Sequence, residues 1–106
     1  MSKIIKANIK HLDEVARLFN LYRIFYKQPD DLERAHQFIK SRMEMKESII
    51  FISNNADGTL SGFVQLYPSF CSVSTIPMLI LYDLFVDPDT RTKGIGRALM
   101  NQAKQY

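Results

Sequence analysis

The chain has 106 residues, of which 46% are hydrophobic and 24% are charged, as is ordinary for one globular domain. No apolar run is long enough to span a bilayer, so we expect no membrane partner. The formal net charge of +3 suits an anionic ligand, but the basic stripe expected of a nucleic-acid-binding protein is missing. The single cysteine, Cys71, excludes an internal disulfide, so we expect a cytoplasmic protein.

The first two predicted elements are a strand and a helix. Residues 3–9 alternate weakly between apolar and polar side chains, which predicts a short strand. Between residues 12 and 26 the apolar side chains recur in steps of three and four, which predicts one face of an amphipathic helix. Pro29 disfavours helical geometry in the residue before it and so ends this helix.

A second helix is predicted directly after this break. Asp30 stands three residues before Glu33, which resembles a capping box at the start of a helix. Apolar side chains at helical spacing then continue to about Lys46. The two helices therefore follow one another with only a short loop between them.

Three strands are predicted next. Residues 48–54 and 60–68 are rich in β-formers and flank a turn that contains Gly58, so they predict a hairpin. Residues 69–77 form a polar connection that Pro77 closes. Residues 78–86 are the most apolar run of the chain, as expected of a central strand that is covered on both faces.

A third helix is predicted from Ile95 to the last residue, Tyr106. The predicted order is β-α-α-β-β-β-α, which indicates an α/β or α+β layered fold in a single domain over residues 1–106.

The segment 86–100, "VDPDTRTKGIGRALM", lies between the apolar strand and this helix. Backbone N–H groups are unpaired at a helix N-terminus, and the helix dipole is positive there. Gly94 and Gly96 lack the Cβ atoms that would hold a bulky anion away from the backbone. Three cations flank them, namely Arg91, Lys93 and Arg97. The pattern indicates a phosphate-binding loop, and its alternative is an ordinary loop with solvated charges.

Two well-known phosphate loops do not fit this segment. A P-loop has Gly-Lys-Ser/Thr, whereas Lys93 precedes Gly94 here and no hydroxyl residue follows. A dinucleotide-binding loop has a third glycine near Leu99 and an acidic residue about twenty positions later, and both are missing. A nucleotide-binding module is therefore disfavoured.

The segment resembles the coenzyme A loop of the GNAT superfamily of N-acetyltransferases. That motif runs from an apolar strand through Val-x-Pro to Arg/Gln-x-x-Gly-x-Gly/Ala and a helix. The matching residues are Val86, Pro88 (after one intervening residue), Arg91, Gly94, Gly96 and Leu99. The upstream order of strand, two helices and three strands is also the order of the superfamily. The resemblance implies an N-acetyltransferase that moves an acetyl group from acetyl-CoA to a primary amine of a small molecule or peptide.

The resemblance also implies which residues bind the coenzyme. Backbone N–H groups of the loop hold its pyrophosphate, and these belong to Arg91, Thr92, Lys93, Gly94, Ile95, Gly96 and Arg97. The main chain of Leu84, Phe85 and Val86 pairs with the pantetheine arm.

Candidate catalytic residues stand on the same strand, at Tyr82 and Asp83. Polyamine-acetylating relatives carry a Glu-Asp pair at these positions, so Tyr82 puts the role of the first acid in doubt. Asp83 is either an amine-binding base or a structural carboxylate, and the sequence leaves both open. The helix end at 22–28 is either an acceptor wall or part of the core. Two isolated histidines predict no metal site.

The superfamily pattern continues with a further strand, a helix and closing strands, which include the usual thiolate-protonating tyrosine. Nothing follows Tyr106 in this sequence, so we expect a C-terminally incomplete domain with weak activity. The exposed sheet edge of such a domain predicts a homodimer. A non-catalytic acyl-CoA-binding or regulatory module is the alternative function.

Overall fold

The structure is a computed structural model, and it describes residues 3–88 and 94–106. The elements in chain order are β1 (Lys3–Lys6), the 3₁₀ helix η1 (Ile9–His11), α1 (Leu12–Phe25), α2 (Leu32–Glu44), β2 (Ile49–Asn54), β3 (Leu60–Cys71), β4 (Ile76–Val86) and α3 (Ile95–Gln105). The predicted order of strands and helices is therefore confirmed. The structure contains one element that was not predicted, the 3₁₀ helix η1. Asn8 caps it by accepting a hydrogen bond from the backbone N–H of Lys10.

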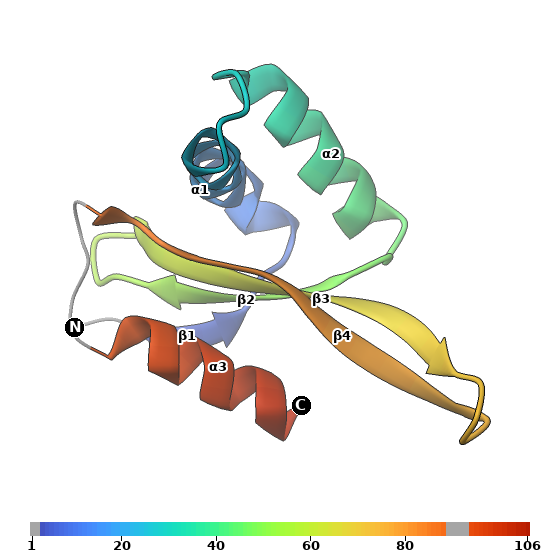
Figure 1. The fold of residues 1–106 in the computed structure, drawn as a ribbon. Helices are drawn as coiled ribbons and strands as arrows, with labels where there is room; N and C mark the ends of the chain where they lie inside the picture. Colours follow the sequence, from blue (N-terminus) through green and yellow to red (C-terminus); the bar gives the residue numbers. More distant parts are fainter. Residues whose placement is uncertain (1–2, 89–93) are drawn as a thin grey trace.

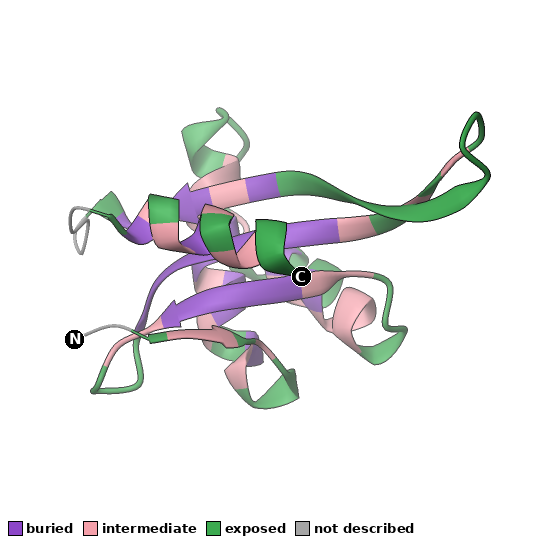
Figure 2. Cartoon of the chain, turned by 90° about the horizontal axis from the view of Figure 1, so that it is seen from below, coloured by how far each residue is buried: buried purple, intermediate pink, exposed green. Residues whose placement is uncertain are grey.

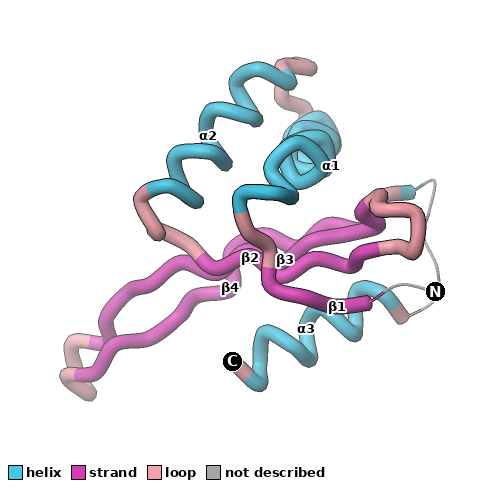
Figure 3. The backbone as a smooth tube through the Cα atoms, turned by 180° about the vertical axis from the view of Figure 1, so that it is seen from behind, coloured by secondary structure: helices cyan, strands magenta, loops and turns pink. Residues whose placement is uncertain are grey.

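The strands form one antiparallel sheet in the order β1-β2-β3-β4. Helices α1 and α2 cover one face of this sheet, and α3 covers the other (Figure 1). The same three layers are seen from behind in Figure 3. This arrangement confirms the predicted α/β (α+β) class. No helix in the described ranges is long and apolar enough to cross a membrane.

The sheet separates two hydrophobic clusters. The cluster under α1 and α2 includes Leu18, Ile39, Ile52 and Phe63. The cluster under α3 is built on Phe51, Val64, Leu66, Ile95 and Leu99. Successive side chains of a strand point to opposite faces, so β2 and β3 supply apolar residues to both clusters in alternation.

The connection between α1 and α2 differs in detail from the capping box predicted at Asp30 and Glu33. Asp31 is the N-cap residue of α2, and its carboxylate accepts a hydrogen bond from the backbone N–H of Arg34. Asp30 instead accepts a hydrogen bond from Nδ2 of the buried Asn20, over 2.8 Å. The Asn20 side-chain oxygen accepts from the backbone N–H of Asp31, so one amide fixes the loop to α1.

The polar connection predicted at 69–77 is wrong. β3 continues to Cys71 and β4 begins at Ile76, so only residues 72–75 turn between the two strands. Ten pairs of residues join the two strands, from Gly62 opposite Val86 to Cys71 opposite Ile76. The outer part of this hairpin extends beyond the helices and is largely exposed (Figure 2). Polar residues and Pro77 are tolerated there because neither face of the arm is buried.

The strand predicted at 78–86 is not covered on both faces in the described part of the chain, whereas the expected exposed sheet edge is present. β4 lies at the edge of the sheet, and residues 76–82 are exposed despite their apolar character. Its pairing with β3 contains a bulge, because Gln65 is opposite Asp83 whereas Leu66 is opposite Leu81. Tyr82 is therefore the extra residue in β4.

Candidate active site

The inner half of β4 carries the residues predicted to bind the pantetheine arm. Phe85 is buried in the cluster under α1 and α2, whereas Leu84 and Val86 pack against the cluster under α3. All three are paired with β3, opposite Phe63, Val64 and Gly62. Among the described residues, no strand lies on the other side of β4.

The predicted coenzyme loop is described only from Gly94 onward. Arg91, Thr92 and Lys93 lie outside the described residues. Gly94 is the N-cap of α3 and has φ +97°, a left-handed conformation that favours glycine. Its carbonyl oxygen accepts a hydrogen bond from Ala98 N over 2.9 Å, which starts the helix.

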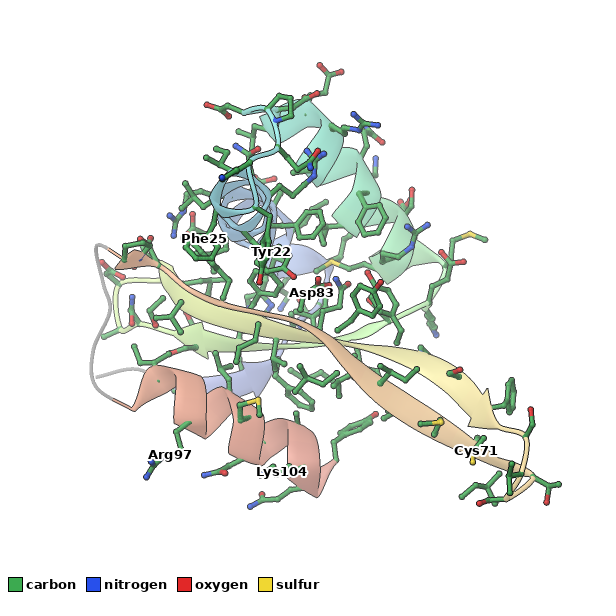
Figure 4. The ribbon with its side chains drawn as sticks, in the orientation of Figure 1. Tyr22, Phe25, Cys71, Asp83, Arg97 and Lys104 are labelled. Atoms are coloured by element: carbon green, nitrogen blue, oxygen red, sulfur yellow. The ribbon has the colours of Figure 1, made fainter. Side chains whose placement is uncertain are left out.

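The described residues leave space around this helix start. Among residues 3–88 and 94–106, nothing lies within 4 Å of a Cβ atom added to Gly94, and one added to Gly96 approaches Cγ2 of Val86, at 3.8 Å. The Ile95 side chain is buried in the core, so this residue has only its backbone to offer a ligand. The side chain of Arg97 is exposed and points away from the sheet (Figure 4). The described residues therefore fit the approach of an anion to the backbone.

Asp83 lies on the face of the sheet that α1 and α2 cover. Its carboxylate is buried, and Oδ2 accepts a hydrogen bond from Nε2 of Gln65 over 2.8 Å. The orientation of the Gln65 amide follows from its other end, where Oε1 accepts a hydrogen bond from the hydroxyl of Ser48 over 2.8 Å. A buried and partnered carboxylate is compatible with both predicted roles, structural and catalytic.

Two tyrosines flank this carboxylate. Burial raises the pKa of the Tyr22 hydroxyl, and interaction with Asp83 raises it further. Burial, followed by the charge of Asp83, raises the pKa of Tyr67 to about 12. Both phenols thus stay protonated at neutral pH. We call Tyr22, Gln65, Tyr67 and Asp83 the acid cluster.

Tyr82 lies beside the acid cluster and is 69% exposed. Its ring stands edge-on to that of Tyr67, with 5.4 Å between the centroids. The bulge presents the Tyr82 side chain in this position, because the extra residue departs from the regular alternation of the strand. The two predicted catalytic residues, Tyr82 and Asp83, thus lie in one region of the sheet. The hydrogen bonds of the described residues include none between these two side chains.

The end of α1 supplies a further group of aromatic side chains. Tyr22 contacts the core rings of Phe63 and Phe85 at 5.8 and 6.0 Å, so it is partly a core residue. Phe25 and Tyr26 are 68% and 61% exposed, with their ring centroids 5.3 Å apart. Figure 4 shows Tyr22 between Phe25 and Asp83, in the space between α1 and β4. We call Phe25, Tyr26 and Tyr82 the aromatic rim.

Sequence reasoning missed the residues that hold β4 in place. The Arg17 guanidinium donates from Nη1 to Oδ2 of Asp87 over 2.9 Å and from Nη2 to the carbonyl oxygen of Leu60 over 3.0 Å. Glu14 binds the same guanidinium through both of its carboxylate oxygens. Asp87 follows β4 directly, so this network fixes the point at which the chain enters the coenzyme loop. The only signal in the sequence was an acid between Val86 and Pro88.

Gly62 was also missed. An added Cβ atom at this residue meets the backbone oxygen of Phe85 at 2.9 Å and Cδ1 of Leu99 at 3.2 Å. A side chain there would separate β3, β4 and α3, so the close packing behind the candidate site depends on this glycine.

The two histidines have local structural roles. Nδ1 of His11 accepts a hydrogen bond from Asn8 N over 3.0 Å as part of the η1 cap. Nε2 of His36 lies 3.1 Å from Oδ1 of Asp13. Within residues 3–88 and 94–106, no group of three or more histidine, cysteine or acidic side chains is placed to hold a metal ion.

Known proteins are similar to this chain in sequence and in fold. Residues 9–106 match the model of the acetyltransferase (GNAT) family. An uncharacterized N-acetyltransferase of Bacillus subtilis, YhfO, is 51% identical over 92 residues, which cover 87% of this chain and 61% of that protein. The chain thus spans less than two thirds of the length of this relative.

Two solved structures extend the comparison. The crystal structure of a probable acetyltransferase superposes with a TM-score of 0.90 at 38% identity, covering 97% of this chain and 69% of the other. A predicted acetyltransferase of Clostridium acetobutylicum, solved with acetyl-CoA, has a TM-score of 0.73 at 14% identity, over 99% of this chain and 75% of the other. At that identity the second likeness shows a common fold. The family match, the relatives and the architecture agree, and this chain belongs to the GNAT family of acetyltransferases.

Proposed function

We propose that this chain is the coenzyme-binding part of an N-acetyltransferase that transfers the acetyl group of acetyl-CoA to a primary amine. The observation that carries the proposal is the placement of two features on one strand. The buried carboxylate of Asp83 faces the helices α1 and α2, and the neighbouring main chain of Leu84 lies at an edge with no described strand beside it. An amine and a thioester can thus meet beside β4.

In this proposal the start of α3 binds the coenzyme. Backbone N–H groups from Arg91 to Arg97 hold the pyrophosphate, and Gly94 and Gly96 leave open space for it. Main-chain groups of Leu84, Phe85 and Val86 align the pantetheine arm. The acetyl-CoA bound by the Clostridium acetobutylicum protein, which has the same fold, supports this choice of acetyl donor.

The acid cluster acts on the acceptor. Asp83 binds the ammonium form of the amine and accepts one of its protons, directly or through water, which frees the nitrogen lone pair. The nitrogen then bonds to the thioester carbonyl carbon, and the carbon–sulfur bond breaks as the tetrahedral intermediate collapses. The leaving thiolate and the proton released by the new amide combine to give the thiol. Tyr82 stands beside this acid as an acceptor contact.

Binding of coenzyme A tests the loop. Replacing Gly94 or Gly96 by valine should weaken the affinity measured by calorimetry at least tenfold, which is about 1.4 kcal/mol. Gly58→Val is the matched control, because Gly58 also has a positive φ (+90°) but lies in the β2–β3 turn. Unchanged affinity in both loop variants would overturn the coenzyme assignment.

Turnover separates the enzyme from the alternative module. Release of free thiol from acetyl-CoA in the presence of an amine supports the acetyltransferase. Tight binding of acetyl-CoA without any thiol release by this chain, over a panel of primary amines, would instead favour a non-catalytic acyl-CoA-binding module.

The exposed hairpin arm supports a homodimer as the assembly. Its apolar side chains include Ile76, which is 53% exposed, and Ile80, which is 40% exposed. Pairing of two arms would cover this surface. Light scattering should then report a dimer that Ile80→Lys shifts toward monomer, and a monomeric parent chain would contradict the proposal. The lone thiol of Cys71 suits a reducing compartment, which supports a cytoplasmic location.

A further inference from the structure

The acid cluster and the aromatic rim adjoin one another. Tyr22 links them, because its ring contacts Tyr26 at 5.1 Å and its hydroxyl interacts with Asp83. On the other side, the Tyr67 ring stands edge-on to Tyr82 with 5.4 Å between the centroids, and the charge of Asp83 raises the pKa of Tyr67. A single buried carboxylate is thus bordered by exposed rings that come from both α1 and β4.

We propose that the acceptor is a monoamine that carries an aromatic or other flat apolar group. Its ammonium lies against Asp83, and its apolar group lies on the aromatic rim. This inference rests on the proposed function, since it names the substrate class of the same site.

The charges of the site favour one cationic group over two. The charged side chains that shift the pKa values of Tyr22 and Tyr67 are Asp83 and Arg42. Asp83 attracts an ammonium, whereas Arg42 lowers the pKa of Tyr67 and repels a second one. Nε of Arg42 donates a hydrogen bond to Oε1 of Glu47 over 2.9 Å, so the Arg42 guanidinium already has an anionic partner. Of the two described carboxylates named here, Glu47 is already paired with Arg42, so the distal ammonium of a diamine would have to compete for it.

The aromatic rim favours an acceptor amine whose apolar part has a flat face. Phe25 is 68% exposed, yet its ring is held between Tyr26 at 5.3 Å and Phe85 at 6.5 Å. Tyr82 is equally exposed and is held by Tyr67. Rings in fixed positions offer contact area at little entropic cost, and they attract both cations and other rings. An aliphatic amine of the same charge would use only the first of these attractions.

The experiment compares three amines as acceptors of this chain: 2-phenylethylamine, n-butylamine and putrescine. The last two differ only in the second amino group, and the first two share one charge but differ in the ring. We expect the specificity constant kcat/KM to be at least tenfold higher for 2-phenylethylamine than for n-butylamine, and lowest for putrescine. A preference for putrescine would overturn the inference.

Variants of the rim show whether the ring preference arises at this surface. Phe25→Leu and Tyr82→Leu should each reduce the preference for 2-phenylethylamine over n-butylamine at least threefold and leave coenzyme A affinity unchanged. Phe70→Leu is the matched control, because Phe70 is 78% exposed but lies near the tip of the hairpin arm. A ring preference that both rim variants retain in full would contradict the proposal.

Direct binding of the amines separates this inference from the proposed function. Ligand-observed NMR in the presence of coenzyme A measures binding without turnover. Ring-selective binding that is lost in Asp83→Asn, without acetylation of any amine, would sustain the ligand class and overturn the acetyltransferase. Acetylation without a preference for the amine that carries a ring would sustain the acetyltransferase and overturn the ligand class. The absence of both binding and acetylation would overturn both proposals.

Discussion

The Arg17 guanidinium lies 2.9 Å from the Asp87 carboxylate and joins the middle of α1 to the residue that follows β4. Asp87 is 5% exposed, and its backbone N–H donates to the carbonyl oxygen of Ser61. The helix that carries Phe25 and the strand that carries Asp83 are thus tied together where the chain enters the predicted coenzyme loop.

Removal of this guanidinium should destabilise the chain. Arg17→Met leaves the Asp87 carboxylate without this partner and should lower the free energy of unfolding by about 2 kcal/mol, the scale of a charged hydrogen bond that is partly exposed. Urea denaturation measures this change. Arg34→Met is the control, because the Arg34 side chain has no hydrogen bond or ion pair with the described residues. Equal stability of the two variants would show that the network contributes nothing.

The same network predicts an acid-sensitive contribution to stability. Burial alone would raise the pKa of Glu14, but hydrogen bonds from Arg17 and Leu60 outweigh it and lower the pKa below its ordinary value of 4.5. A carboxyl group with a lowered folded-state pKa stabilises the fold above its unfolded pKa, and this contribution disappears as the pH falls through the folded-state pKa. The parent chain should therefore melt above Glu14→Gln at pH 7, and the difference in Tm should shrink below pH 4.5. A pH-independent difference would assign the effect to packing.

Two glycine-to-alanine variants should respond in opposite ways. Gly62→Ala places a Cβ atom 2.9 Å from the backbone oxygen of Phe85, so it should cost about 1–3 kcal/mol of stability. Gly96→Ala meets only an ordinary contact at 3.8 Å and should stabilise α3 by about 0.5–1 kcal/mol. If the start of α3 binds the pyrophosphate through its backbone, coenzyme A affinity should change little in Gly96→Ala, because the motif that this segment resembles accepts alanine at this position. Chemical denaturation and calorimetry together check both effects.

Asp83→Asn distinguishes a reacting carboxylate from a purely structural one. The variant keeps the shape of the side chain, so a general base lost from the acceptor side should lower turnover at least tenfold while coenzyme A affinity stays within about twofold. Asp13→Asn, with a side chain 94% exposed on α1, is the control. Full turnover in Asp83→Asn would leave this carboxylate with a structural role only.

Local signals in the sequence predicted the helices, the turn at Gly58 and the order of the strands. Apolar spacing located α1 and α2, although Leu32 and Phe38 on α2 are 52% and 38% exposed. Gly58 has the expected positive φ (+90°). The left-handed conformation of Gly94, at the start of α3, was not predicted, because the two glycines were interpreted only as making room for an anion. The features that were predicted depend on neighbours within a few residues.

Features that depend on distant residues were not predicted. Gln65 is 18 positions from Asp83, and Arg17 is 70 positions from Asp87, so no periodicity connects either pair. The exposure of the outer part of β4, which was predicted to be covered on both faces, was missed for a related reason. Its apolar run is as dense as that of a covered strand, and only the sheet order shows which face and which edge remain open.

The bulge at Tyr82 divides β4 into two segments. Within each segment, successive side chains alternate regularly between the two faces of the sheet. Leu81 pairs with Leu66 on the α3 side, and Asp83 pairs with Gln65 on the side of α1. These neighbours already alternate as if Tyr82 were absent, so deletion of this one residue leaves both segments in register. The shortened chain should fold with the same ladder and a straighter outer edge. In most strands the deletion of one residue moves the following side chains to the opposite face of the sheet. Deletion of Tyr82 should instead leave the core packing unchanged and alter only the outer edge of β4.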